Sequence, residues 1–345
     1  MRKLLLILAL AAVGSSTAPL ARPSQASFAN PVLDADFPDP TVIGTPGGYY
    51  AYATQTQRDG KWVNIQLAWS NDLVHWRYGG DALPKKPSWA ATTQDFWAPH
   101  VERIGRRYVM YYSAKPDNSD ERHGLCLGVA TARGPGGPFV DAGRPLLCGA
   151  GFVNIDPMAF HDPATGKLLL YWGSGFEPLK VQPLSADGLS FARGSRAKDL
   201  VWPNRKKDAF PVLVEGSWVV RHGGYYYLFY SGDNCCGPKA NYVVMVARSR
   251  SATGPFQTLE QATAKPHSII LQKAGHWIAP GHNSVITDKA GQDWMVYHAV
   301  DARRPRTQQS DELNTRRVML IDRIVWRKGW PVIAPPSDRL QSAPR

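Results

Sequence analysis

Short runs of apolar and aromatic residues return along this chain at a nearly constant interval. The runs are YYAYAT from Tyr49, YVMYYSA from Tyr108, LLLYWGS from Leu168, YLFYSG from Tyr227 and WMVYHAV from Trp294. Each follows a glycine-containing turn, and each has a tyrosine three residues after its first bulky residue, at Tyr52, Tyr111, Tyr171, Tyr230 and Tyr297. These tyrosines are 59, 60, 59 and 67 residues apart. Aromatic and β-branched runs entered from tight turns predict five β-strands in hairpins.

The pattern continues beyond each tyrosine run. VATARGPGGPF from Val129 resembles VARSRSATGPF from Val246, and LAWSNDLVHW from Leu67 has the same place in the first unit. We interpret these segments as a third strand and the turn into a fourth. No long segment shows the 3.6-residue apolar period of a helix. Five repeats of about 60 residues, each made of a few strands, predict an all-β protein with the fold of a five-bladed β-propeller. A jelly roll or sandwich does not explain the five-fold recurrence.

A polar or ionisable residue next to proline or glycine precedes each run. These residues are Asp39, His100, Asp156, Glu215 and His282, and they lie 13, 11, 15, 15 and 15 residues before the tyrosines. That separation is one hairpin, so each residue is predicted to begin the innermost strand of its blade. Innermost strands surround the axis of a propeller, and the five side chains are therefore expected to meet at one end of it.

Three carboxylates brought together in this way lose hydration and repel one another. Each one alone could cap a turn, as Asp next to Pro often does. Three at matched positions suit glycoside hydrolysis with inversion, in which one acid protonates the leaving oxygen and another activates water. A third can position the acid and adjust its pKa.

These segments resemble glycoside hydrolase family 43. The resemblance rests on NPVLDADFPDPTVI, DFWAPHV, NIDPMAFHD, VEGSWVV, GHNSVI and RRVMLIDRIVWRKGWPVI, in that order, between Asn30 and Ile333. It implies a five-bladed propeller and an inverting mechanism. It also implies Asp39 as general base, Glu215 as general acid and Asp156 as the residue that orients the acid and modulates its pKa. Asp34 and Asp36 are interpreted as turn or rim residues.

Other residues take expectations from the same resemblance. Trp97 is similar to a sugar-stacking residue, although a tryptophan in a strand can equally belong to the core. Arg317 resembles a substrate-binding arginine, with its neighbour Arg316 as the alternative. His100 stands where many members have aspartate, so a role in a substrate subsite is expected but its nature is open. His282 resembles an axial histidine near a central metal, commonly calcium; the alternative is a histidine that only forms hydrogen bonds, because no acidic cage is visible.

The sequence motifs indicate the family more clearly than they indicate which sugar is the substrate. NIDP and PGHNSVITD favour the arabinan-cleaving branch, whereas WAPH also occurs in xylosidase-like members. Many xylosidases of the family carry a second β-sandwich domain, which is not expected in the short segment after Trp326. We therefore expect an α-L-arabinofuranosidase or arabinanase that acts on plant cell-wall polysaccharide, with β-D-xylosidase as the alternative. A sugar-binding propeller without catalysis is the alternative of another class, and it is disfavoured because all three acids are present.

The start of the chain predicts export. Arg2 and Lys3 precede an apolar run from Leu4 to Val13 and then small residues, which is typical of a secretory signal peptide. Residues 1–26 are predicted to be signal peptide and leader, and residues 27–345 a single catalytic domain, extracellular or periplasmic and monomeric. Loss of Arg2 and Lys3 with the signal peptide changes the net charge from +12 to +10. The basic residues are dispersed, so neither nucleic acid nor a membrane is expected as a partner.

Four cysteines fit an oxidising compartment. Cys126 and Cys148 are interpreted as one pair. Cys235 and Cys236 are adjacent, and the sequence leaves open whether they bond to each other, stay free or pair with the other two. A zinc site is disfavoured because no second pair has ligand spacing.

Overall fold

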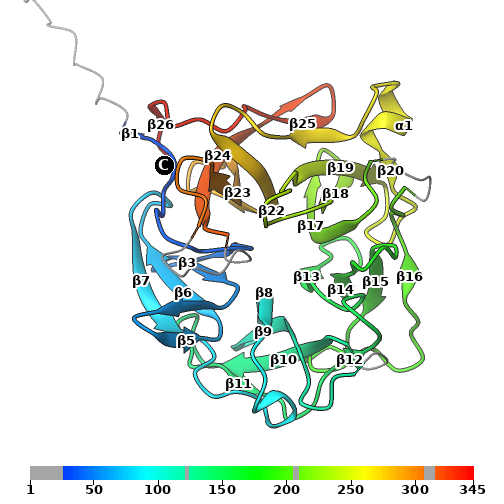
Figure 1. Ribbon diagram of the computed structural model, residues 1–345. Coiled ribbons are helices and arrows are strands. Elements are labelled where there is room, and N and C mark those ends of the chain that lie inside the picture. The colour runs from blue at the N-terminus through cyan, green and yellow to red at the C-terminus, as the bar shows by residue number, and fades with distance from the viewer. Residues whose placement is uncertain (1–25, 121–123, 205–209, 307–314) are drawn as a thin grey trace, which may run out of the picture.

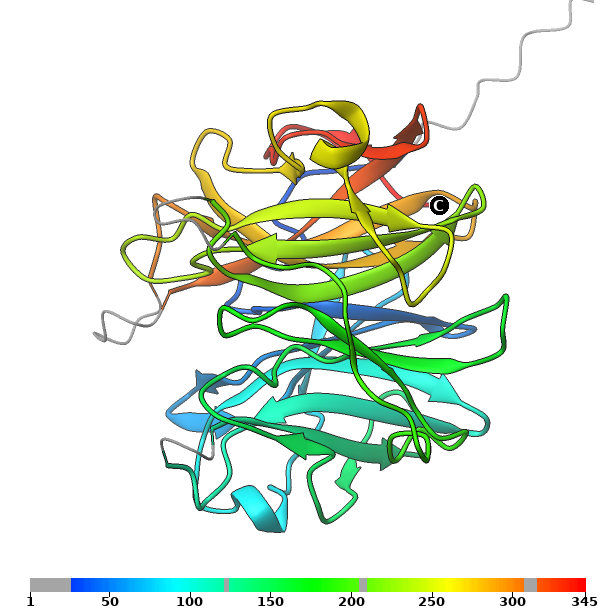
Figure 2. The same ribbon diagram turned by 90° about the vertical axis from the view of Figure 1, so that its right-hand side faces the viewer.

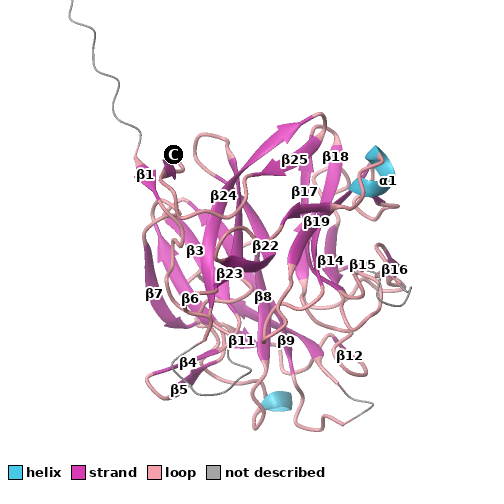
Figure 3. Ribbon diagram, turned by 45° about the horizontal axis from the view of Figure 1, so that its top comes forward, coloured by secondary structure: helices cyan, strands magenta, loops and turns pink. Residues whose placement is uncertain are grey.

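The computed structural model describes residues 26–120, 124–204, 210–306 and 315–345. Five antiparallel sheets surround a central axis (Figure 1). Apart from the short helix α1 (Leu259–Thr263) and a 3-10 turn at Ser88–Ala90, the described chain consists of strands and loops (Figure 3). The protein is therefore a five-bladed β-propeller, and this prediction from the repeat is confirmed.

Each blade is one sheet, and the blades follow one another along the sequence (Figures 1 and 2). From the axis outward, the first contains β2 (Thr41–Thr45), β3 (Gly48–Ala53), β6 (Gln66–Ser70) and β7 (Trp76–Asp81). The second contains β8 (Phe96–Ile104), β9 (Arg107–Ala114), β10 (Cys126–Ala132) and β11 (Val140–Asp141), with β12 (Leu147–Cys148) also on β10. The third contains β13 (Met158–His161), β14 (Leu168–Trp172), β15 (Lys180–Pro183) and β16 (Lys198–Asp199).

The last two blades complete the ring. The fourth contains β17 (Val214–His222), β18 (Tyr225–Gly232), β19 (Val243–Ser249) and β20 (Gln257–Thr258), with β21 (Ile269–Leu271) also on β19. The fifth contains β22 (Trp277–Thr287), β23 (Asp293–Asp301), β24 (Arg317–Arg327) and β25 (Trp330–Ile333). A separate hairpin of β4 (Thr56–Arg58) and β5 (Lys61–Val63) leaves the first blade between β3 and β6.

The five repeated tyrosines all lie in the second strand of a blade, and all five are buried. The first three donate a hydrogen bond to a backbone carbonyl in the outer turn of the next blade: Tyr52 to Pro135, Tyr111 to Gly188 and Tyr171 to Ala252. Each hydroxyl group is thus satisfied at an interface between blades, where an unpaired polar group would be costly.

A ring of hydrogen bonds joins the blades around the axis. One residue at or just before each innermost strand has a left-handed backbone: Asp39 (φ 56°), Ala98 (43°), Asp156 (59°), Gly216 (62°) and His282 (48°). Their N–H groups donate to the preceding blade, to His298 Nδ1, Thr54 Oγ1, Ser113 Oγ, Asp156 Oδ2 and Ser231 Oγ respectively, at distances of 2.7 to 3.1 Å. These residues therefore mark equivalent positions of the five blades.

This ring shows that two tyrosines are out of register with the others. Tyr52 lies two residues before Thr54, whereas Tyr230 lies one residue before Ser231 and Tyr297 one before His298. Successive side chains of a strand point to opposite faces. Accordingly, Tyr297 donates to the Asp322 carboxylate of its own blade, at 2.6 Å, and not to the next blade. The prediction of five second strands that carry the tyrosines is thus confirmed, with Tyr230 and Tyr297 offset by one residue within their strands.

The two ends of the described chain close the ring between the fifth and first blades. β1 (Ser27–Phe28) pairs with β26 (Gln341–Ser342), and residues 32–37 run beside the start of β24. Between them, the Asn30 side chain exchanges two hydrogen bonds with the backbone of Ile321, at 2.9 and 3.0 Å. We call residues 27–37 the closing segment.

Both pairs of cysteines are disulfides. Cys126 and Cys148 lie opposite each other on β10 and β12 and are bonded, as predicted. Cys235 and Cys236 are bonded to each other, which decides between the alternatives left open by the sequence. In the described part of the chain, no helix is long and apolar enough to cross a membrane. Residues 1–25 of the predicted leader lie outside the described residues.

Candidate active site

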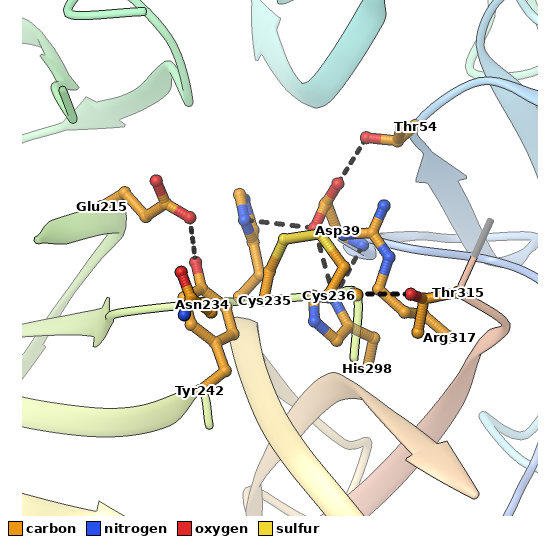
Figure 4. The surroundings of a disulfide bond; sticks show 12 residues. Asp39, Thr54, Glu215, Asn234, Cys235, Cys236, Tyr242, His298, Thr315 and Arg317 are labelled. Carbon is orange, nitrogen blue, oxygen red and sulfur yellow. Dashed lines mark hydrogen bonds and ion pairs between the residues drawn. A yellow bond between two sulfur atoms is a disulfide. The ribbon is translucent and has the colours of Figure 1, made fainter. Parts of the chain in front are cut away.

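Asp39 is held at the axis by groups from the first and fifth blades (Figure 4). Its Oδ2 accepts a hydrogen bond from Thr54 Oγ1 at 2.6 Å, and its Oδ1 accepts one from Arg317 Nη1 at 3.0 Å. His298 Nδ1 and His282 Nδ1 lie 3.2 and 3.3 Å from Oδ1. The carboxylate is therefore fixed in position by short contacts from three different strands and the loop that follows β3.

The surroundings of Asp39 favour its ionised form. Burial alone would raise the pKa of Asp39, but the Arg317 guanidinium, His282 and His298 outweigh it and hold this pKa well below its usual value. Burial also lowers the pKa of His298 to about 4, so its ring is neutral at pH 7. A neutral ring can accept the Asp39 N–H bond at Nδ1, which agrees with the geometry.

Glu215 is held by neutral hydroxyl groups. Ser174 Oγ donates to its Oε2 at 2.6 Å, and the Tyr242 hydroxyl donates to its Oε1 at 2.7 Å. Burial raises the pKa of Glu215, the two hydroxyl groups oppose this change, and the charge of Asp39 adds to it; the net result is a raised pKa. Glu215 thus differs from Asp39 in the direction of its shift.

Asp156 is buried between the other two acids. Its Oδ2 accepts the Gly216 N–H bond at 3.1 Å and lies 3.8 Å from His282 Nδ1. Burial first, and then the charges of Glu215 and Asp39, raise the pKa of Asp156 well above its usual value. Because Asp156 and Glu215 repel each other when both are charged, the pair retains a proton to higher pH than an isolated carboxyl group.

A large open cavity of about 1050 Å³ lies next to Asp39: its lining includes Thr54 and Arg317, which contact the Asp39 carboxylate, but none of the three acids themselves. Trp97, Arg317, Thr54 and Cys236 are among its lining residues, and Trp62 of the β4–β5 hairpin stands half exposed at its edge. The predicted sugar-binding residues Trp97 and Arg317 are thus brought to one cavity. Its lining combines tryptophan rings with many charged and polar side chains, which suits a polar ligand with apolar faces.

The structure separates the two neighbouring arginines. Arg317 contacts the Asp39 carboxylate, whereas Arg316 and Arg304 pair with Asp34 at the rim. Asp36 accepts the backbone N–H bond of Arg317 at 3.0 Å, so it positions that residue. Of the two alternatives, Arg317 is therefore the one directed at the carboxylates, and Asp34 lies at the rim as predicted.

Asp39, Asp156 and His282 occupy the left-handed position of their blades. His100 and Glu215, which the sequence aligned with them, do not. Glu215 lies one residue before the left-handed Gly216, as Trp97 lies one before Ala98. His100 lies two residues after Ala98, is buried, and packs edge-on against Trp218 with ring centroids 5.2 Å apart. It lines a separate small cavity of about 20 Å³ with Asp39 and Asp156, and not the large one. A direct contact between His100 and substrate is thus not supported by its placement.

His282 lies between Asp39 and Asp156. Burial lowers the pKa of His282 in spite of the Asp39 charge, so its ring is neutral at pH 7. Calcium prefers six to eight oxygen ligands, yet among the described residues no group of three or more histidine, cysteine or acidic side chains is arranged to hold a metal ion. These residues do not fit the calcium ion that the family resemblance implies, and no step proposed below involves a metal.

Several contacting residues were not found from the sequence. They are Thr54, Ser174, Tyr242 and His298. A signal existed for three of them: Thr54, Ser174 and His298 follow the repeated tyrosine of their blade by two, three and one residues. Tyr242 lies just before β19, in a loop that has no counterpart in the repeat.

One carboxylate kept ionised and another with a raised pKa, beside a large open cavity, define the site of a glycoside hydrolase. The family model described as glycosyl hydrolases family 43 matches residues 28–331, and the chain belongs to this family. It is 27% identical over 312 residues to a probable arabinan endo-1,5-alpha-L-arabinosidase A of Aspergillus clavatus, covering 86% of this chain and 90% of the relative. It is 26% identical to the extracellular exo-alpha-(1->5)-L-arabinofuranosidase ArbA of Cellvibrio japonicus, covering 89% of each.

A solved structure has the same fold. The crystal structure of a thermostable family-43 glycoside hydrolase superimposes with a TM-score of 0.73 and 25% sequence identity, covering 92% of this chain and 99% of the other. The described residues therefore contain the whole propeller of a family member.

Proposed function

We propose that this protein is an inverting glycoside hydrolase that cleaves α-L-arabinofuranosidic linkages in arabinan or arabinose-decorated plant polysaccharide. The observation that carries the proposal is the opposite shift of two carboxyl pKa values in one site: the pKa of Asp39 is held well below its usual value by Arg317 and the neighbouring histidines, and burial raises the pKa of Glu215. Such a pair supplies a base and an acid at the same pH.

In the proposed reaction, Asp39 accepts a proton from a water molecule as that water attacks the anomeric carbon. Glu215 donates its proton to the glycosidic oxygen as the bond between this oxygen and the anomeric carbon breaks. The new bond forms on the face opposite to the leaving group, so the configuration is inverted. Ser174 and Tyr242 hold the Glu215 carboxyl group during the transfer.

Three other residues have supporting roles in this proposal. Asp156 raises the proton affinity of the pair that it forms with Glu215 and fixes the backbone beside it through Gly216. Arg317 keeps Asp39 charged and lines the cavity in which the sugar binds. Trp97 offers an aromatic face in the same cavity for stacking on a sugar ring.

The substrate class rests on the relatives, whose names record arabinan and α-(1,5)-linked arabinofuranose. Export rests on the predicted signal peptide and on the extracellular relative. We expect the protein to meet its substrate outside the cytoplasm, as a monomer and as a single domain from residue 27 to residue 345.

The test is a substrate panel with product stereochemistry. Purified protein is incubated with linear arabinan, arabino-oligosaccharides, and 4-nitrophenyl α-L-arabinofuranoside and β-D-xylopyranoside, and the first-formed sugar is followed by proton NMR. We expect cleavage of the arabinosides with a β-configured first product. Cleavage of the xyloside alone would show that the substrate is a β-D-xyloside and not an arabinoside. An α-configured first product from an arabinoside would contradict inversion. Binding without cleavage of any glycoside would support the non-catalytic alternative.

A further inference from the structure

The loop between β18 and β19 brings the Cys235–Cys236 disulfide into the site (Figure 4). The bond between these two adjacent residues holds both sulfur atoms together in the loop. Both cysteines are only partly buried. The sulfur atoms thus present a small polarisable surface and not part of the core.

On one side, this disulfide is linked to the proposed acid. Cys235 packs against a small buried cluster that contains Tyr242, Ala279 and Val300. The hydroxyl group of Tyr242 is the one that donates to Glu215, at 2.7 Å. The position of the disulfide is therefore fixed relative to Glu215 through one side chain.

On the other side, the loop reaches the proposed base. The Gly237 N–H group, one residue after the disulfide, donates to Thr315 Oγ1 at 2.7 Å. Thr315 lies two residues before Arg317, which contacts Asp39. Cys236 itself lines the large cavity together with Trp97 and Arg317. In Figure 4 the disulfide accordingly lies between Glu215 with Tyr242 and Asp39 with Arg317.

The loop has other bonds that hold its shape. Asn234 accepts the backbone N–H groups of both Asn241 and Tyr242, at 3.0 Å each. The Asp233 carboxylate accepts the N–H groups of Val212 and Leu213 at its base. Because these bonds already close the loop, a role of the disulfide as a structural link alone leaves its exposed position in the cavity wall unexplained.

We propose that the Cys235–Cys236 disulfide determines specificity by direct contact with the substrate, as the apolar wall on which the carbon face of the sugar ring packs between Glu215 and Asp39. This inference rests on the proposed function for the identity of the sugar. This wall differs chemically from Trp97. The indole ring of Trp97 offers a flat aromatic surface, whereas the disulfide offers two sulfur atoms, which suit the small puckered face of a pentose. Loss of the disulfide thus weakens binding of the sugar more than it slows the bond-breaking step.

The first experiment compares two double variants of the full chain. In Cys235→Ala with Cys236→Ala, the KM for 4-nitrophenyl α-L-arabinofuranoside is expected to rise roughly tenfold, which corresponds to the loss of one good apolar contact, while kcat changes less than about threefold. The matched control, Cys126→Ala with Cys148→Ala, removes the disulfide of the second blade and should leave KM unchanged. An unchanged KM in the first variant, or an equal rise in both, would overturn the proposal.

A second measurement does not depend on the folding of the cysteine variants or on turnover. The Glu215→Gln variant is mixed with a phosphine reductant, and reduction of each disulfide is followed by mass spectrometry with and without (1→5)-α-L-arabinotriose or (1→4)-β-D-xylotriose. We expect arabinotriose to slow reduction of Cys235–Cys236 at least fivefold without slowing that of Cys126–Cys148. Protection by xylotriose alone would support the wall and refute the proposed sugar. Cleavage of arabinan by the wild type without protection by either sugar would refute the wall and support the proposed sugar, and neither cleavage nor protection would refute both.

Discussion

At the scale of single residues, the site depends on a difference between the partners of Asp39 and those of Glu215. Asp39 faces a guanidinium group, whereas Glu215 faces two neutral hydroxyl groups. A cation stabilises the ionised form of a carboxyl group far more than a hydroxyl donor does. The proposed division into base and acid thus rests on Arg317, Ser174 and Tyr242 as much as on the acids themselves.

The loss of activity on replacing Glu215 should therefore depend on the leaving group, whereas the loss on replacing Asp39 should not. Glu215→Ala is expected to lower kcat/KM on arabinan by about 10² to 10⁴, the usual contribution of a general acid, but to retain much of the activity on a 2,4-dinitrophenyl arabinoside, whose leaving group needs no proton. Asp39→Ala should lose activity on both substrates, because no other group activates the water. Equal losses on the two substrates in both variants would contradict the assignment.

Asp156 is expected to act through the proton of its neighbour. Asp156→Asn keeps the shape of the side chain and removes the repulsion that makes the pair hold its proton. Activity needs the protonated acid and falls as the pH rises through its pKa, so the basic limb of the pH profile should move to lower pH, by roughly one unit. Asp187→Asn, in an exposed turn of the same blade, is the control. A basic limb that stays in place would show that Asp156 does not modulate the pKa of Glu215 and only accepts the Gly216 N–H bond.

Arg317 should control the opposite limb. Removing its charge in Arg317→Gln raises the pKa of Asp39, and because the base must be ionised, the acidic limb is expected to move to higher pH. Arg316→Gln removes the neighbouring charge, which pairs with Asp34 and not with Asp39. Its acidic limb should stay in place. The comparison is made with kcat/KM profiles of both variants, and a shift in the Arg316 variant alone would reverse the assignment.

At the scale of elements, the sequence predicted the strands better than their register. The aromatic runs identified all five second strands, since bulky residues between glycine turns do not fit another element. In the fourth blade, however, Phe229 and Tyr230 are adjacent and only one can face the next blade. Irregular pairing between Glu215 and Trp218 in β17 further offsets the spacing. Such offsets cannot be counted from the sequence, because a bulge has no fixed residue signature.

The register of the repeat also explains which site residues the sequence revealed. Asp39 and Asp156 lie at equivalent positions, in agreement with the count from the repeat. Glu215, which the same count and the family motif both selected, lies one residue before the equivalent position. Tyr242 and the Cys235–Cys236 disulfide come from a loop between strands, whose path depends on contacts with other blades. Loops of this kind are not encoded by a local pattern.

The hydrogen-bond ring predicts a cost for losing one of its acceptors. Ser231→Ala leaves the buried N–H group of His282 without its partner, and an unsatisfied buried donor costs about 1 to 3 kcal/mol. The free energy of unfolding, measured by urea denaturation, should fall by that amount. Ser251→Ala, in an exposed turn of the same blade, should change it by less than about 0.5 kcal/mol. Equal effects of the two variants would show that the ring bond contributes little.

At the scale of the whole molecule, the closing segment connects the fifth blade to the first through a buried acid. Asp322 accepts hydrogen bonds from Tyr297 and from Asn30, at 2.6 and 3.3 Å, and it has no cation among the contacts that the structure describes. Burial raises the pKa of Asp322 to about 7. The folded protein thus favours the protonated form, in contrast to the unfolded chain.

The sign of the pH effect follows from this shift. A carboxyl group whose pKa is higher in the folded state contributes stability that is complete below its unfolded value, near 3.8, and that is lost as the pH rises through about 7. In Asp322→Asn this loss is removed, so the free energy of unfolding should vary less between pH 5 and pH 8 than in the wild type. Asp199→Asn, at the surface of the third blade, is the control. A wild-type slope retained in Asp322→Asn would show that another group causes it.

The closing segment also determines when the ring of blades can close during synthesis of the chain. Asn30 and Ile321 are 291 positions apart in the chain, and translation proceeds at about 5 to 20 residues per second. The segment is therefore synthesised on the order of 15 to 60 s before the strand that receives it. During that interval the carbonyl groups of Met319 and Arg317, which accept the N–H groups of Val32 and Phe37 in the finished protein, have not been made, so the ring stays open between the first blade and the last. The edge of the first blade that the closing segment joins to the fifth is therefore completed only when the last blade has been made.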